Sequence, residues 1–130
     1  MNTLRRKSFL EKFARKNKAE AIKISSALFE QNVQLKEIQD LMERIRELRE
    51  NSDEKIFKSP AELRATRWYS LKLAEQTEIL ENRIEFVEKE IAELKKNSRN
   101  KSLKNTKLED LIKNAKHMVQ LEKERELDKK

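Results

Sequence analysis

Apolar residues in the first half of the chain recur at alternating steps of three and four. The run consists of Leu10, Phe13, Asn17, Ala21, Ile24, Leu28, Gln31, Leu35, Ile38, Met42 and Ile45. A 3.5-residue repeat is typical of a coiled-coil helix, whose apolar stripe packs against a partner helix. Asn17 and Gln31 are polar positions in this stripe, and such positions usually fix the register at some cost in stability. The pattern predicts a helix over residues 3–50.

Turn chemistry is concentrated in the segment that follows, NSDEKIFKSP at residues 51–60. Ser59 suits the N-cap of a helix, where its hydroxyl accepts a backbone N–H. Pro60 suits the first helical position, and Glu62 completes a capping box. We therefore predict a turn over residues 51–59 and a second helix that begins at residue 60.

A second apolar stripe follows with the same period. It contains Leu73, Thr77, Leu80, Ile84, Val87, Ile91 and Leu94, lapses over residues 95–107, and returns in phase at Leu108, Ile112, Ala115 and Val119. A return in phase argues for one continuous helix over residues 60–127. Because the connection is short, the two helices should be antiparallel neighbours. The predicted fold is all-α, a single antiparallel coiled-coil domain over residues 1–130 with a longer second helix.

Several side chains are expected to hold this hairpin together. The stripe positions with this structural role are Leu28, Leu35, Leu80 and Ile84. Trp68 and Leu71 are expected to close the hairpin end against Leu48, Ile56 and Phe57. The alternative for Trp68 is a partner-binding hot spot, since tryptophan is enriched in such positions.

The end of the second helix is expected to lack a partner within the chain. Pairing about the turn places opposite each other residues whose numbers add to about 110, so the first helix ends beside residue 107. The remaining residues carry an apolar stripe, and an exposed stripe implies a partner chain. The predicted partner-binding side chains are Leu108, Leu111, Ile112, Ala115, Met118 and Val119.

Charge is uneven along the chain, whose net charge is +7. Residues 1–23 hold eight basic and two acidic side chains, and residues 95–107 hold six basic and none acidic. Antiparallel pairing brings both basic blocks to the same end, which suggests an acidic partner, although basic blocks are also common as solvated faces. The basic candidates for partner binding are Arg5, Arg6, Lys7, Arg15, Lys16, Lys101 and Lys104.

Composition argues against catalysis and cofactor binding. The chain has no glycine, where average usage predicts about nine, which makes phosphate-cradling loops and Gly-rich cofactor turns improbable. It has no cysteine, and His117 is the only histidine, so thiolate sites and His pairs are excluded. A two-helix fold also lacks the concave site that enzymes generally need. We expect no catalytic residue, no metal and no cofactor.

The run RATRWYSLKLAEQTEILENRIEFVEKEIAEL at residues 64–94 and the tail ending in Glu126-Leu127-Asp128 complete a distinctive layout. With two unequal helices and a basic N-terminus, the chain resembles the FliJ-like (YscO-like) stalk proteins of flagellar and type III secretion export systems. The resemblance implies an antiparallel coiled coil similar to the central stalk of rotary ATPases. It also implies that the end with both termini inserts into the hexameric ring of the export ATPase. Family members contact the export gate, and some escort export chaperones.

The expected function is therefore that of a non-enzymatic stalk or adaptor in the cytoplasm, peripheral at the inner face of the cell membrane. No apolar run approaches the roughly 18 residues that a spanning helix needs. One alternative is a generic scaffold that dimerises through the overhang. Another is a basic rod that binds nucleic acid, but its basic blocks hold few aromatics for base stacking, so specific binding is not expected. The segment with Leu4, Phe9, Leu10 and Phe13 is also suited to lie on an anionic membrane surface.

Overall fold

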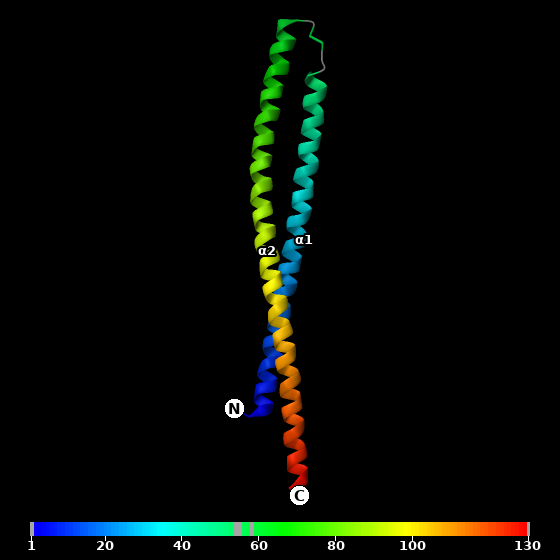
Figure 1. Ribbon diagram of the computed structural model, residues 1–130. Coiled ribbons are helices and arrows are strands. Elements are labelled where there is room, and N and C mark those ends of the chain that lie inside the picture. Colours follow the sequence, from blue (N-terminus) through cyan, green and yellow to red (C-terminus); the bar gives the residue numbers. More distant parts are fainter. Residues whose placement is uncertain (1, 54–55, 58, 130) are drawn as a thin grey trace. The chain divides into compact units, whose positions relative to one another are not determined.

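The computed structural model describes residues 2–53, 56–57 and 59–129, and they form two long helices (Figure 1). Helix α1 spans Thr3–Asp53 and helix α2 spans Pro60–Asp128. The described residues contain no strand, so the fold is the predicted all-α helical hairpin. Helix α1 runs to Asp53, where the sequence predicted an end at residue 50. Residues 54, 55 and 58 of the predicted turn lie outside the described residues.

Helix α2 begins at the predicted cap. The backbone N–H of Glu62 donates to Ser59 Oγ at 3.2 Å, and the N–H of Leu63 donates to the Ser59 carbonyl at 3.2 Å. Pro60 has no N–H to leave unpaired in this first turn. The predicted role of Ser59 as the N-cap of α2 is therefore confirmed.

Replacing Ser59 by alanine should lower the free energy of unfolding by about 1 kcal/mol, because the Glu62 N–H loses its side-chain acceptor. Urea unfolding followed by circular dichroism measures this loss. Ser26→Ala is the matched control: Ser26 is exposed inside α1, where alanine slightly favours the helix. Equal stability of the two variants would show that the cap contributes nothing.

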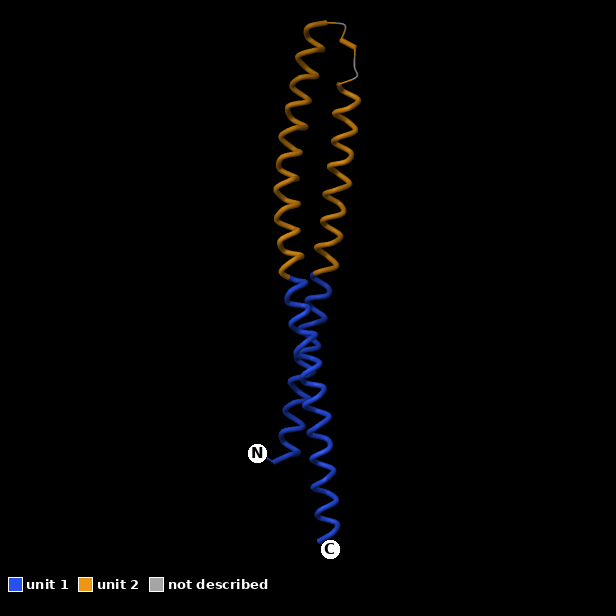
Figure 2. Tube along the Cα trace, viewed as in Figure 1, with its two compact units in different colours: residues 1–27, 94–130 blue, residues 28–93 orange. Residues whose placement is uncertain are grey.

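The chain forms two compact units (Figure 2). We call residues 28–93 the turn unit, and residues 1–27 together with 94–130 the terminal unit. The sequence predicted one domain over residues 1–130. Each helix contributes to both units, and each unit has its own buried cluster.

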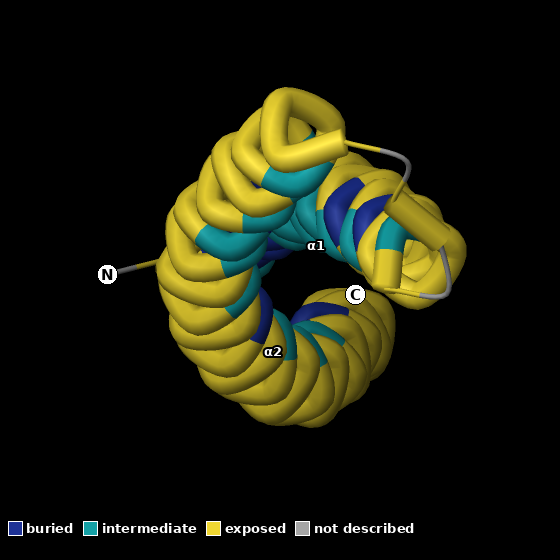
Figure 3. Tube along the Cα trace, turned by 90° about the horizontal axis from the view of Figure 1, so that it is seen from above, coloured by how far each residue is buried: buried dark blue, intermediate teal, exposed yellow. Residues whose placement is uncertain are grey.

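The core of the turn unit lies along the predicted stripes. Its buried residues are Ile38, Ile45, Leu73, Leu80, Val87 and Ile91, with Leu28, Leu35, Met42 and Ile84 packed against them. Buried and half-buried positions follow one side of each helix (Figure 3). The structural roles predicted for Leu28, Leu35, Leu80 and Ile84 are thus confirmed.

The core of the terminal unit is small. Its buried residues are Leu10, Ala14, Leu108 and Ala115, with Ile112 packed against them. Residues 95–107 are helical, as the return in phase predicted. The stripe position predicted for Phe13 is wrong, because Phe13 is exposed and Ala14 is buried. Counting back from Ala21 in strictly alternating steps of four and three residues leads to Asn17 and then to Ala14. Phe13 therefore lies beside the helix interface rather than in it.

The register of the terminal unit differs from the prediction. The side-chain amide of Asn17 donates to the Lys101 carbonyl at 3.0 Å, whereas the expected partner was residue 93. Near the end of the pairing, Thr3 Oγ1 donates to a Glu122 carboxylate oxygen at 2.5 Å. Helix α1 therefore covers α2 well beyond residue 107, and the predicted overhang from residue 108 is wrong.

A groove lies beside the connection between the two helices. In the turn unit, Arg49 and Ser52 of α1 border one groove with Leu63 and Thr66 of α2, and Phe57 borders it too. Residues from both helices therefore lie close together next to the connection.

The role predicted for Trp68 at the hairpin end is also wrong. Trp68 is 62% exposed, and Leu71 and Ile56 are exposed as well. Continuing the α2 stripe back from Leu73 reaches Ser70, Thr66 and Leu63, all half-buried. Trp68 falls outside this stripe, and the Lys72 Nζ lies 5.7 Å from the centre of its ring.

Candidate partner-binding surface

The structure divides the predicted apolar partner-binding residues into two groups. Leu108, Ala115 and Val119 are buried, and Ile112 is half-buried against the terminal cluster. These four side chains are not available to a partner, so their predicted role is wrong. Their cover is α1 itself, because the register differs from the one expected. Leu111 and Met118 remain exposed.

The predicted basic residues all lie in the terminal unit, where the two basic blocks come together. The exposed ones are Arg5, Arg6, Arg15, Lys16 and Lys104. Lys7 is half-buried, and its Nζ lies 4.0 Å from the Glu11 carboxylate. Lys101 is half-buried and forms an ion pair with Glu20 across the helix interface. Five of the seven cations are therefore open to a partner.

The Glu20–Lys101 pair joins α1 to α2. The hydrogen bond from Lys101, followed by the charge of Lys101, lowers the pKa of Glu20, while partial burial acts in the opposite direction. The bond neutralises a carboxylate that would otherwise lie among cations. The pair cancels one negative and one positive charge, so the net charge of the surrounding surface stays as the residue count gives it.

A polar layer lies beside this pair. Asn17 is only 2% exposed, and its Oδ1 atom accepts no hydrogen bond from any described residue. The buried Oδ1 of Asn105 is likewise without a described donor, although its amide donates to Glu109 at 3.2 Å. A buried acceptor left unpaired lowers stability by about 1–3 kcal/mol. The terminal unit thus combines a small apolar core with an imperfectly paired polar layer.

Exposed aromatic and basic side chains meet on one side of the terminal unit. The rings of Phe9 and Phe13 lie 6.0 Å apart, centre to centre, along α1. From α2, the Lys104 Nζ lies 4.8 Å from the centre of the Phe13 ring. Arg6, which precedes Phe13 by seven residues, borders a groove of about 140 Å³. Leu111 and Met118 of α2 are among the other residues that line this groove.

The heptad spacing explains why these side chains share a side. Phe13 follows Arg6 by seven residues, and Lys104, Leu111 and Met118 are seven residues apart. Side chains seven apart occupy the same position around a coiled-coil helix. We call this surface the basic flank, which contains Arg6, Phe9, Phe13 and Lys16 of α1 and Lys104, Leu111 and Met118 of α2.

Sequence reasoning assigned five of these seven to partner binding and linked the two phenylalanines to a membrane surface. It did not bring the two sets together, because their juxtaposition depends on which part of α2 lies beside Phe13. The available signal was that Phe9 and Phe13 are large apolar residues next to the strict stripe rather than on it.

The turn unit carries a second exposed apolar region. A groove of about 470 Å³ lies between the helices, lined on α2 chiefly by Ile79, Arg83 and Phe86 and on α1 by Gln31 and Gln34. Its apolar side chains come from α2, and its amide side chains come from both helices, since Asn82 of α2 also lines it. None of these residues was predicted from the sequence to belong to a site.

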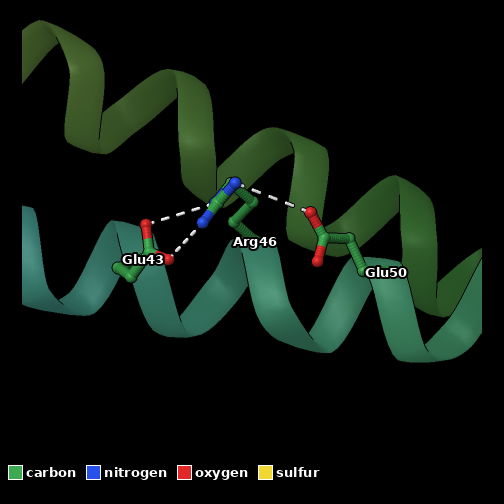
Figure 4. A network of polar contacts seen from close by, with 3 residues as sticks. All are labelled: Glu43, Arg46 and Glu50. Carbon is green, nitrogen blue, oxygen red and sulfur yellow. Dashed lines mark hydrogen bonds and ion pairs between the residues drawn. The ribbon is translucent and has the colours of Figure 1, made fainter.

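The polar network around Arg46 is local to α1 (Figure 4). Arg46 donates to Glu43, with Nε 3.2 Å from Oε2, and its Nη1 lies 3.6 Å from Glu50. The hydrogen bond with Glu43 raises the pKa of Arg46 and lowers that of Glu43. All three side chains are well exposed, so solvent screens these ion pairs and they add little to stability. This network supports the helix and forms no binding site.

Across residues 2–53, 56–57 and 59–129, no cluster of three or more His, Cys, Asp or Glu side chains is arranged to hold a metal ion. Neither of the two helices has a stretch apolar enough to cross a membrane. No protein-family model, curated protein or solved structure matches the chain.

Proposed function

We propose that the chain is a non-enzymatic coiled-coil stalk or adaptor of a flagellar or type III protein export apparatus. It would couple the hexameric export ATPase to the export gate, with export chaperones as further partners, in the cytoplasm at the inner face of the membrane. The observation that carries the proposal is the antiparallel pairing of two unequal helices, Thr3–Asp53 and Pro60–Asp128. This is the fold implied by the resemblance of residues 64–94 and of the charged tail to the FliJ-like proteins.

The terminal unit is the end proposed to meet the ATPase ring. It contains both basic blocks and both ends of the chain. The free part of α2 is short, since residues 123–129 are all exposed and follow Glu122, which bonds to Thr3. We therefore assign ring contact to this tail and to the exposed cations. The buried positions Leu108, Ala115 and Val119 are excluded from that role.

The mechanism would be mechanical and allosteric. Neither helix contains glycine, and a mid-helix glycine would soften it by about 1 kcal/mol. A stiff, asymmetric helix pair in a ring would favour some subunit arrangements over others, which changes ring assembly and cycling through differential contacts. The protein itself would supply no reacting group.

Removing residues 123–130 should abolish most of the stimulation of a cognate export ATPase. Helicity per residue should stay unchanged, because every described residue in this tail is exposed. Phosphate release by the ATPase measures stimulation, and circular dichroism measures helicity. A variant with the tail residues in scrambled order keeps length and net charge, so it separates the effect of sequence from that of length.

Two results would contradict parts of this proposal. Full stimulation by the truncated chain would show that the tail is not the working end. Failure of the intact chain to bind or stimulate the ATPase would reject the stalk function. If the same chain formed a stable dimer, the scaffold alternative would replace it.

A further inference from the structure

The basic flank exposes more apolar surface than the fold requires. Phe9 is 59% exposed and Met118 is 50% exposed, and they come from different helices. Phe13 and Leu111 are exposed as well. None of these four side chains belongs to the buried cluster of the terminal unit. Exposing these apolar side chains to water is unfavourable, and burial within the hairpin does not offset this cost.

Cations border these apolar side chains from both helices. Lys104 lies over the Phe13 ring, Arg6 borders the groove with Leu111 and Met118, and Lys16 follows Phe9 by seven residues. Glu20 follows Phe13 by seven residues, so it occupies the same side, but its carboxylate is bonded to Lys101. The flank therefore presents apolar groups within a field of positive charge.

We propose that the basic flank docks on the surface of an anionic lipid bilayer. Phenylalanine, leucine and methionine side chains would enter the boundary between headgroups and acyl chains, while arginine and lysine would pair with lipid phosphates. This inference goes beyond the proposed function and does not depend on the ATPase. It concerns one unit only, since all seven residues lie in the terminal unit.

The shape of the flank favours a bilayer over a partner helix. A helix needs a continuous groove for its apolar side chains, whereas the groove here measures about 140 Å³, room for about one side chain. The phenylalanine rings and the Met118 side chain are exposed rather than enclosed. Nucleic acid fits less well, because Leu111 and Met118 have no flat face on which a base would stack.

Vesicle co-sedimentation tests the proposal with the full chain. Binding is expected to vesicles that contain phosphatidylglycerol and to be absent with pure phosphatidylcholine. The double variant Phe9→Ser, Met118→Ser should bind at least about tenfold more weakly, because it removes two inserting side chains. Each substitution replaces an exposed side chain, so circular dichroism should show unchanged helicity.

The matched control is Leu4→Ser with Ile22→Ser. Both residues are exposed apolar side chains of α1 in the terminal unit. They follow the half-buried Thr3 and Ala21, whereas Phe13 precedes the buried Ala14, which places the two sets on opposite sides of the helix. The control should bind phosphatidylglycerol vesicles as the wild type does. Equal loss in the two double variants would overturn the proposal.

A fluorescence measurement keeps the proposal testable if a serine variant misfolds. In a Trp68→Phe background, the Phe9→Trp variant should shift its tryptophan emission to the blue when phosphatidylglycerol vesicles are added. The Leu4→Trp variant in the same background should show no shift. Absence of a shift at position 9 would overturn the proposal. So would binding to acidic polypeptide or nucleic acid without binding to vesicles.

Discussion

Replacing Leu80 by aspartate is expected to unfold the turn unit. Leu80 is 5% exposed and belongs to the cluster with Ile38 and Ile45 of α1. Truncating a buried leucine costs about 2–5 kcal/mol. Placing a carboxylate there without a partner adds a desolvation penalty. The total is comparable to the 5–15 kcal/mol that typically separates folded from unfolded domains.

The neighbouring residue offers a strict control for this prediction. Ile79 is 51% exposed, so Ile79→Asp introduces the same charge one position away without burying it. Thermal unfolding by circular dichroism should show a collapse for Leu80→Asp and a change within about 0.5 kcal/mol for Ile79→Asp. Leu28→Asp and Ile84→Asp should fall between them, because both side chains are half-buried against the same cluster. Equal behaviour of Leu80→Asp and Ile79→Asp would show that the α2 stripe does not face α1.

Replacing both Asn17 and Asn105 by leucine is expected to stabilise the terminal unit by a few kcal/mol. Each substitution removes a buried Oδ1 atom without a described donor, and each such atom costs about 1–3 kcal/mol. The variant loses the bond from Asn17 to the Lys101 carbonyl, worth about 0.5–1.5 kcal/mol. The leucine side chains also add apolar contact with the small cluster around Ala14. This contact raises the stability of the unit, as does the removal of the two unpaired oxygen atoms.

Amide hydrogen exchange measures the stability of each unit separately. In the double variant, exchange should become slower for residues 3–27 and 94–129 and should change little in the turn unit. Asn100→Leu is the control, because Asn100 is exposed and reports only the change in helix propensity. The double variant is also expected to populate alternative pairings, since polar stripe positions fix register. Sedimentation velocity would detect them as added oligomers. Stability no higher than that of Asn100→Leu would mean that both oxygens are already paired in solution.

The local features of this chain were predictable because they depend on nearby residues alone. A repeat of 3.5 residues selects a helix and the side of it that is buried, and the stripe from Leu73 to Val119 is buried or half-buried at every predicted position. The cap at Ser59 and Pro60 depends on four consecutive residues. Phe13 was wrongly assigned to the buried stripe of α1, because two steps of four residues followed each other there, from Phe13 to Asn17 and from Asn17 to Ala21.

The pairing of the helices was not predictable in the same way. Sliding one helix by a heptad brings another apolar position to the same place, so the stripes alone fit several registers almost equally well. The observed register places Lys101 beside Asn17 and Glu20, where two polar interactions join the helices. A shift of one heptad would break both. The candidate site changed with the register, because burial of Leu108, Ala115 and Val119 depends on where α1 lies.

The sequence by itself determined that the chain folds into two long helices, where the second begins, and which stripe of each is buried. Helical period and capping are properties of contiguous residues, so no distant contact was needed. The tertiary structure decided which residues lie opposite each other, and therefore that α2 is covered up to Glu122. It also decided that Phe9, Phe13, Lys104 and Met118 share one exposed flank. These depend on the side-by-side fit of two helices, in which polar contacts select among registers that apolar contacts leave nearly equal in energy.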